Sequence, residues 1–218
     1  MVFEDTIAAI ATALLPSGLG VIRISGPDAF ACAEDLFAPS VKETPVAKFP
    51  HHRLVHGWIM DGDSPVDEVL LTLMRAPHSY TSEDVVEIQA HGSVLGLKSI
   101  LELVLSRGVR LARPGEFTER AFLSGRLDLT RVEALADLIH ARSERALRQA
   151  AQQLRGGLYD TIVEYREELV GVASLVEATI EFPDENVEFT SRGECLTRLG
   201  NLRERIDGML AGASQARQ

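Results

Sequence analysis

The chain has 218 residues, of which 45% are hydrophobic and 25% charged, and this balance excludes a disordered or collagen-like chain. Its formal net charge of -10 disfavours nucleic-acid binding through charge alone, although a local basic patch stays open. Cys32 and Cys195 provide neither a disulfide framework nor a four-cysteine zinc site, and they favour a reducing compartment.

The first apolar segment, Ile7 to Leu15, is too short to cross a membrane, because a spanning helix needs ~18–20 apolar residues. Glu4 and Asp5 precede it, whereas a signal peptide begins with cations. We therefore expect a soluble, cytoplasmic protein with no membrane partner.

Residues 1–118 are predicted to form a mixed α/β domain, because short runs rich in Val, Ile and Leu alternate there with Gly, Pro and Asp. The predicted strands are Thr6–Thr12, Gly20–Ser25, Leu54–Met60, Val69–Met74, Val85–Ala90 and Val109–Ala112. Pro27–Phe37 and Ser93–Ser106 have helical composition, and a helix-ending Arg107-Gly108 follows the second.

Residues 119–218 are predicted to form a helical domain of three long helices, so the fold class is α+β. The first helix begins at a capping box, Thr130 with Glu133, and the last at a second box, Ser191 with Glu194. The middle helix carries one apolar stripe at spacings of three and four: Leu158, Ile162, Tyr165, Leu169, Val172, Val176 and Ile180. Such stripes need a covering partner, which suggests that the helical domain is incomplete.

The segment Gly92–Ser99 nearly matches the phosphate-binding loop Gly-x-x-x-x-Gly-Lys-Ser/Thr. Its second glycine, Gly96, comes one position early, and Lys98 is detached from it. Backbone N–H groups would then not surround the phosphates before the helix begins, so we do not interpret it as a nucleotide site.

The histidines and cysteines offer few sites for chemistry. His51, His52 and His56 lack a Cys or carboxylate at ligand spacing, so strand histidines are favoured over a metal site. His91 ends a predicted strand just before a helix, where both a functional and a structural role stay open. Cys32, between two alanines, is interpreted as a small buried hydrophobe. No catalytic or metal-binding residue is predicted.

Two charges stand inside predicted strands. Arg23 lies within Gly20–Ser25 and Glu87 within Val85–Ala90. Such a charge either faces solvent or binds a partner in a pocket, because a buried and unpaired charge is too costly.

Three parts of the chain carry distinctive motifs: Asp5–Thr12 with Gly20–Gly26, then Ser79–Gly92, then Ala112–Leu129. In this order they resemble the signatures of the MnmE (TrmE) family of tRNA modification GTPases. Glu133–Ile139 and Ile180–Glu185 also match, so the resemblance covers essentially the whole chain. The chain departs from the family at Ala13–Leu19, where relatives are usually richer in glycine.

The resemblance implies an N-terminal domain similar to folate-binding aminomethyltransferases, which binds a tetrahydrofolate derivative (5-formyl- or methylene-tetrahydrofolate) and forms a homodimer. With its FAD-containing partner MnmG (GidA), the intact family protein adds an aminomethyl-type group to carbon five of the wobble uridine of certain tRNAs. GTP, Mg²⁺ and K⁺ belong to a GTPase domain inserted in the family's helical domain. We expect that this domain is absent here and that the chain does not hydrolyse GTP.

The family's folate contacts fall on Arg23 in the first signature, Glu87 in the second and Arg126 in the third, where relatives often carry Lys. One carboxylate can accept the adjacent amino group and ring N–H of a reduced pterin, and arginine suits the carboxylates of the glutamate tail. Our hypothesis assigns Glu87 to the pterin and both arginines to polar or anionic parts of folate.

Two rival functions stay open: a non-enzymatic interaction module with a vestigial folate site, and a stand-alone folate-dependent aminomethyltransferase. The module predicts no heat on titration with 5-formyltetrahydrofolate. Full activity without MnmG or GTP would favour the stand-alone enzyme.

Overall fold

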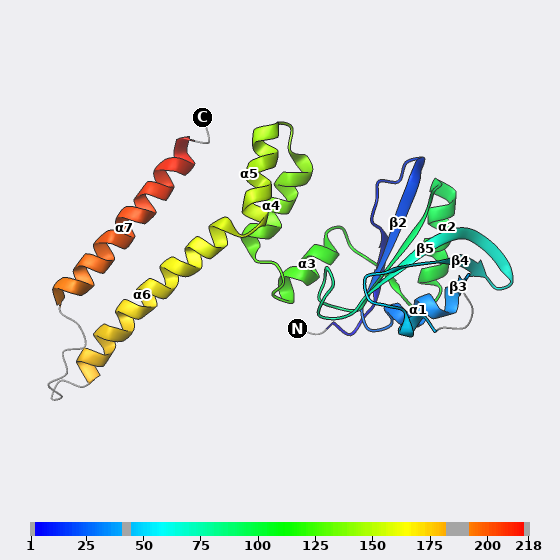
Figure 1. The fold of residues 1–218 in the computed structure, drawn as a ribbon, viewed down its shortest axis with the longest axis horizontal. Coiled ribbons are helices and arrows are strands. Elements are labelled where there is room, and N and C mark those ends of the chain that lie inside the picture. The colour runs from blue at the N-terminus through cyan, green and yellow to red at the C-terminus, as the bar shows by residue number, and fades with distance from the viewer. Residues whose placement is uncertain (1–2, 41–44, 182–191, 216–218) are drawn as a thin grey trace. The chain divides into compact units, whose positions relative to one another are not determined.

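The computed structural model describes residues 3–40, 45–181 and 192–215. The chain divides into two compact units, which we call the N-terminal unit (Met1–Val132) and the C-terminal unit (Glu133–Gln218). The first contains a sheet with helices, and the described part of the second is helical (Figure 1), which confirms the predicted fold class. The expected boundary between residues 118 and 119 falls within helix α3 (Glu116–Leu123), in the N-terminal unit.

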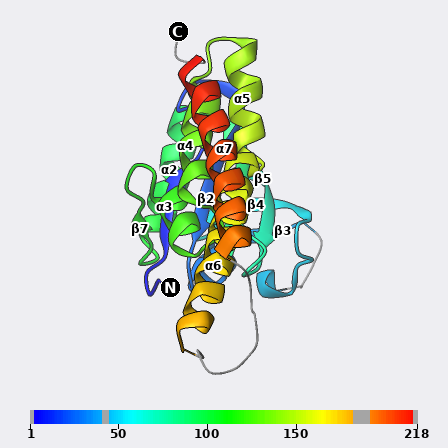
Figure 2. The same cartoon turned by 90° about the vertical axis from the view of Figure 1, so that its left-hand side faces the viewer.

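The N-terminal unit is built on a seven-stranded sheet with the order β3-β4-β5-β6-β2-β1-β7, so that β3 and β7 form its edges (Figure 2). The strands are β1 (Ile7–Ile10), β2 (Ser17–Ser25), β3 (Phe37–Pro39), β4 (Leu54–Asp61), β5 (Ser64–Met74), β6 (Val85–Gly92) and β7 (Arg110–Leu111). Only the β1–β7 pair is parallel among the described strands. The sequence missed β3, because three residues are too few to show strand alternation.

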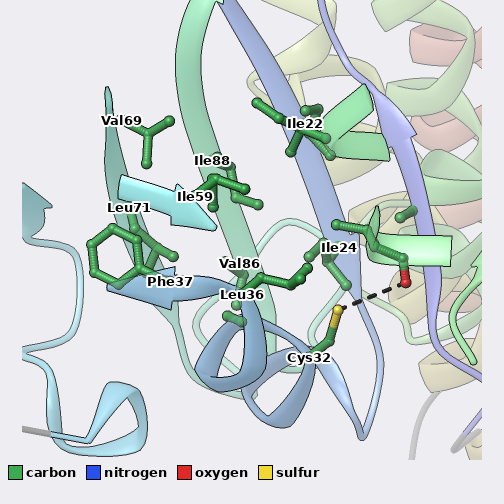
Figure 3. Close-up of a cluster of buried hydrophobic side chains, with 14 of the residues drawn as sticks. Ile22, Ile24, Cys32, Leu36, Phe37, Ile59, Val69, Leu71, Val86 and Ile88 are labelled. Atoms are coloured by element: carbon green, nitrogen blue, oxygen red, sulfur yellow. Dashed lines mark hydrogen bonds between the residues drawn. The ribbon is translucent and has the colours of Figure 1, made fainter. Parts of the chain in front are cut away.

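Helices α1 (Ala29–Leu36) and α2 (Val94–Leu105) pack against one face of this sheet. Their apolar residues form the core with alternate strand residues (Figure 3), which include Ile22, Ile24, Ile59, Leu71, Val86 and Ile88. Cys32 belongs to this core, where its thiol lies 3.9 Å from the Val104 carbonyl oxygen. Burial raises the pKa of this thiol to about 11, so Cys32 is a buried hydrophobe, as predicted. The remaining strand residues point to the opposite face of the sheet.

The C-terminal unit contains the greater part of α4 (Leu129–His140), together with α5 (Glu144–Leu154), α6 (Gly157–Glu181) and α7 (Arg192–Gln215). The first predicted helix is therefore two helices, and the prediction of one was wrong. Ser143 caps α5, because its hydroxyl accepts the Ala146 N–H at 3.2 Å.

The predicted start of α4 also needs correction. The helix begins at Leu129, so Thr130 lies inside it, and the Asp128 carboxylate accepts a backbone N–H of the first turn, that of Arg131, at 3.0 Å. The second predicted capping box lies partly outside the described residues, since Ser191 is not among them, and so does most of the matching segment Ile180–Glu185.

Arg205 joins α7 to α6, where it contacts Glu168 at 2.9 Å and lies 4.7 Å from the centre of the Tyr165 ring. Tyr165 and Val172 of the predicted stripe are buried. The other stripe residues, Leu158, Ile162, Leu169, Val176 and Ile180, are 37–74% exposed. None of the described helices has the length and hydropathy required to span a membrane.

Candidate functional site

The two charges predicted inside strands lie side by side on the sheet face opposite α1 and α2. Arg23 of β2 pairs in register with Glu87 of β6, and Glu87 pairs in turn with Thr72 of β5. The neighbouring Ile22 and Ile24 enter the core, so alternation directs Arg23 to the other face. Both charged side chains are half-buried and bind each other, so neither charge is buried without a partner.

The Arg23–Glu87 ion pair uses only one oxygen of the carboxylate. Arg23 Nε and Nη2 lie 2.8 and 2.7 Å from Glu87 Oε1. The two side chains are 23% and 20% exposed, so solvent or a ligand can reach the pair. Within the described part of the chain, no hydrogen bond to Glu87 Oε2 is found, and this oxygen is available as an acceptor.

Tyr80, in the loop between β5 and β6, links this pair to the third predicted site residue. The guanidinium of Arg23 lies 5.0 Å from the centre of the Tyr80 ring, and that of Arg126 lies 5.1 Å from it. Arg126 also donates to the Tyr80 carbonyl oxygen at 3.1 Å. Tyr80 therefore brings together Arg23 and Arg126, from distant segments, and Glu87 joins them through its ion pair with Arg23.

Two aromatic residues of this cluster were missed by the sequence reasoning. Tyr80 donates to or accepts from the Thr118 hydroxyl at 2.9 Å, and the Phe117 ring centre lies 5.5 Å from the Arg23 guanidinium. Both aromatic residues lie inside the signature segments, but their contacts with cations depend on the tertiary fold. The signal that could have found them is that Tyr80 shares a signature segment with Glu87, and Phe117 shares one with Arg126.

A buried arginine holds the elements that carry these aromatic rings. Arg120 of α3 is 1% exposed and binds Glu83 at 3.0 Å and Asp5 Oδ1 at 2.8 Å. It also donates to the Asp5 carbonyl oxygen at 2.9 Å and lies 4.5 Å from the Phe3 ring centre. Arg120 thus ties α3, which carries Phe117, to the start of the chain and to the loop after Tyr80.

A second set of ion pairs holds Glu116, at the start of α3. Arg110 binds its carboxylate at 2.6 and 3.1 Å, and the Arg113 backbone N–H donates to it at 2.7 Å. The hydrogen bonds from Arg110 are the largest cause that lowers the pKa of Glu116 to about 2, and burial opposes them. The same arginine lowers the pKa of Asp5.

This low pKa predicts a specific loss of stability in acid. The ionised Glu116 stabilises the fold above its ordinary pKa of 4.5, and this contribution is lost as the pH falls towards about 2. Substitution E116Q should lower the Tm near neutral pH and flatten its pH dependence between about pH 5 and about pH 2. Thermal unfolding across this range measures both effects. The control E119Q changes a half-exposed carboxylate that pairs only with Arg113 in the described structure, and should keep the wild-type slope. Parallel curves for E116Q and wild type would contradict the prediction.

The near-match to a phosphate-binding loop does not form such a loop. β6 extends to Gly92 and α2 begins at Val94, so only Ser93 connects them, and its hydroxyl caps α2. A Cβ at Gly92 would clash with the backbone and side chain of Ser17, because β2 packs closely there. This geometry agrees with rejecting the segment as a nucleotide site.

The histidines make separate pairs. The His51 and His52 rings lie 3.8 Å apart, and His56 Nε2 lies 2.7 Å from Glu68 Oε1. His91 Nδ1 lies 2.7 Å from Asp67 Oδ1, and this hydrogen bond raises the pKa of His91. Across residues 3–40, 45–181 and 192–215, no three His, Cys, Asp or Glu side chains gather so as to hold a metal ion.

Comparison with known proteins gives matches along nearly the whole chain. A family model described as GTP-binding protein TrmE N-terminus matches residues 6–126, and one described as MnmE helical domain matches residues 129–218. The tRNA modification GTPase MnmE of Symbiobacterium thermophilum is 44% identical over 214 residues, which are 96% of this chain and 47% of that protein. Its namesake in Syntrophobacter fumaroxidans is 46% identical, over 98% of this chain and 47% of the relative. The chain thus spans about half the length of these relatives.

Proposed function

The chain belongs to the TrmE (MnmE) family of tRNA modification GTPases, and from that premise we propose that its N-terminal unit binds a tetrahydrofolate derivative as a one-carbon donor. The observation that carries this proposal is that the ring of Tyr80 lies beside both Arg126 and the arginine of the Arg23–Glu87 ion pair. Each residue comes from a different signature segment, and Arg23 and Glu87 lie on the sheet face opposite α1 and α2.

The chemistry of these groups fits a reduced folate. Glu87 accepts the adjacent amino and ring N–H donors of the pterin, and the guanidinium of Arg23 lies beside this carboxylate. The rings of Tyr80 and Phe117 offer aromatic surface beside the pterin. Arg126, which is exposed, binds a carboxylate of the glutamate tail at the rim. When bound, the folate supplies the one-carbon unit.

We likewise propose that the chain is part of a protein with the activity of the intact family. Together with MnmG, the protein adds an aminomethyl-type group to carbon five of the wobble uridine of tRNA in the cytoplasm. The N-terminal unit forms the homodimer in this scheme, and the helices of the C-terminal unit connect it to the GTPase, which uses GTP, Mg²⁺ and K⁺.

Titration calorimetry of the 218-residue chain with 5-formyltetrahydrofolate tests the folate site. We expect saturable heat with one ligand per chain. The fragment p-aminobenzoylglutamate lacks the pterin that Glu87 recognises, and should give far weaker heat. A folded chain that gives no heat with 5-formyltetrahydrofolate would refute the proposal and favour a non-enzymatic module.

A further inference from the structure

Thr72 carries a buried hydroxyl, and the packing of the sheet does not explain why a polar group lies there. Its Oγ1 is closed to solvent and has no hydrogen-bond partner in the described structure. The other residues of Val69–Met74 are apolar, and valine would fill the same space without a polar atom. A hydroxyl buried without a partner destabilises the folded state, so packing alone does not account for a threonine here.

The position of Thr72 relates this hydroxyl to the proposed folate site. Thr72 of β5 stands directly opposite Glu87 of β6, and Glu87 stands directly opposite Arg23 of β2. Side chains opposite each other on antiparallel strands have Cβ atoms about 5 Å apart, within reach of a hydroxyl and a carboxylate. Glu87 therefore has one cross-strand neighbour on each side.

Of these two neighbours, only Arg23 makes a hydrogen bond to Glu87 in the described structure. Arg23 directs two N–H groups at Oε1 of the carboxylate, whereas the hydroxyl of Thr72 makes no hydrogen bond in the described structure. A ligand with two adjacent donors needs both carboxylate oxygens. To bind it, the Glu87 side chain must therefore rotate out of the position in which Arg23 contacts Oε1 alone. The turned carboxylate then needs a donor on the side away from Arg23.

We propose that Thr72 is a positioning residue for Glu87: its hydroxyl donates to the Glu87 carboxylate when that carboxylate engages the paired donors of a reduced pterin. The inference rests on the proposed folate-binding function. The hydroxyl is thus kept without a partner in the free protein because it is used in the bound state.

Substitutions T72V and T72S test this role by affinity and stability together. T72V removes the hydroxyl at nearly constant shape, and should weaken the affinity for 5-formyltetrahydrofolate about tenfold, the equivalent of one hydrogen bond to a charged group. The Tm of the free T72V protein should equal or exceed that of wild type, because a buried polar atom without a partner is removed. T72S keeps the hydroxyl and should retain affinity within about threefold.

The outcomes separate this inference from the folate proposal. Wild-type affinity in T72V, with wild-type protein that binds folate, would overturn the role of Thr72 alone. A wild-type chain that does not bind folate would refute both. A fall in Tm together with lost affinity in T72V, not rescued in T72S, would show a purely structural role and also overturn the inference.

Discussion

Substitution E87Q is expected to weaken binding of 5-formyltetrahydrofolate by about 100-fold, because an amide cannot accept two adjacent donors and carries no charge. The shape of the side chain is kept, so the loss measures the chemistry of the carboxylate. Arg23 loses its ionic partner, but it is 23% exposed and stays beside the rings of Tyr80 and Phe117. We therefore expect only a small change in the Tm of the free protein.

Titration calorimetry measures this loss, with E102Q as the matched control. Glu102 is exposed on α2, on the far side of the sheet from Glu87, and its substitution should leave the affinity unchanged. Equal affinities for E87Q and wild type, in folded protein, would remove Glu87 from the site. An equal loss in E102Q would mean that net charge, and not a specific contact, governs binding.

Substitution R120M should cause the largest loss of stability, about 3–5 kcal/mol in the free energy of unfolding. Methionine keeps an apolar stem but removes the charge that pairs with Asp5, Glu83 and Glu116. Glu83 and Glu116 are 14% and 4% exposed, so they would keep a large part of their desolvation cost without this partner.

Urea denaturation followed by the fluorescence of Trp58 measures this effect. Trp58 is the only tryptophan of the chain and lies on β4, so its signal reports on the N-terminal unit. The control R113M changes an arginine that is 67% exposed, and should cost at most about 1 kcal/mol. If R120M and R113M unfold at the same denaturant concentration, the buried cluster does not stabilise the unit.

The site could be predicted in part because strand alternation and resemblance to a family point to the same residues. Arg23 and Glu87 are conspicuous as charges inside apolar runs, and the signatures add Arg126. Their mutual contact could not be predicted, because it depends on the register of β2 against β6, 64 positions apart in sequence. Thr72 gave no sequence signal at all, since threonine is ordinary in a strand.

The burial of charged side chains was the main feature that could not be predicted from the sequence. Nothing in the sequence pattern of and before α3 distinguishes the buried Arg120 from the exposed Arg113, because the distinction depends on carboxylates supplied by distant segments. The break between α4 and α5 was missed for a different reason. Helical spacing of apolar residues continues through it, although the capping serine, Ser143, marks the start of a new helix.

The contact between Asp5 and Arg120 joins positions 115 residues apart. β1 lies between β2 and β7, so the first strand of the unit is completed by one of the last segments to be synthesised. During translation, the ribosome must release the chain to beyond Arg120 before this arrangement can close, and until then the N-terminal strand lacks its partner on one side. Synthesis thus delays native folding of the unit to a late step, when the segment from β7 to α3 emerges from the exit tunnel.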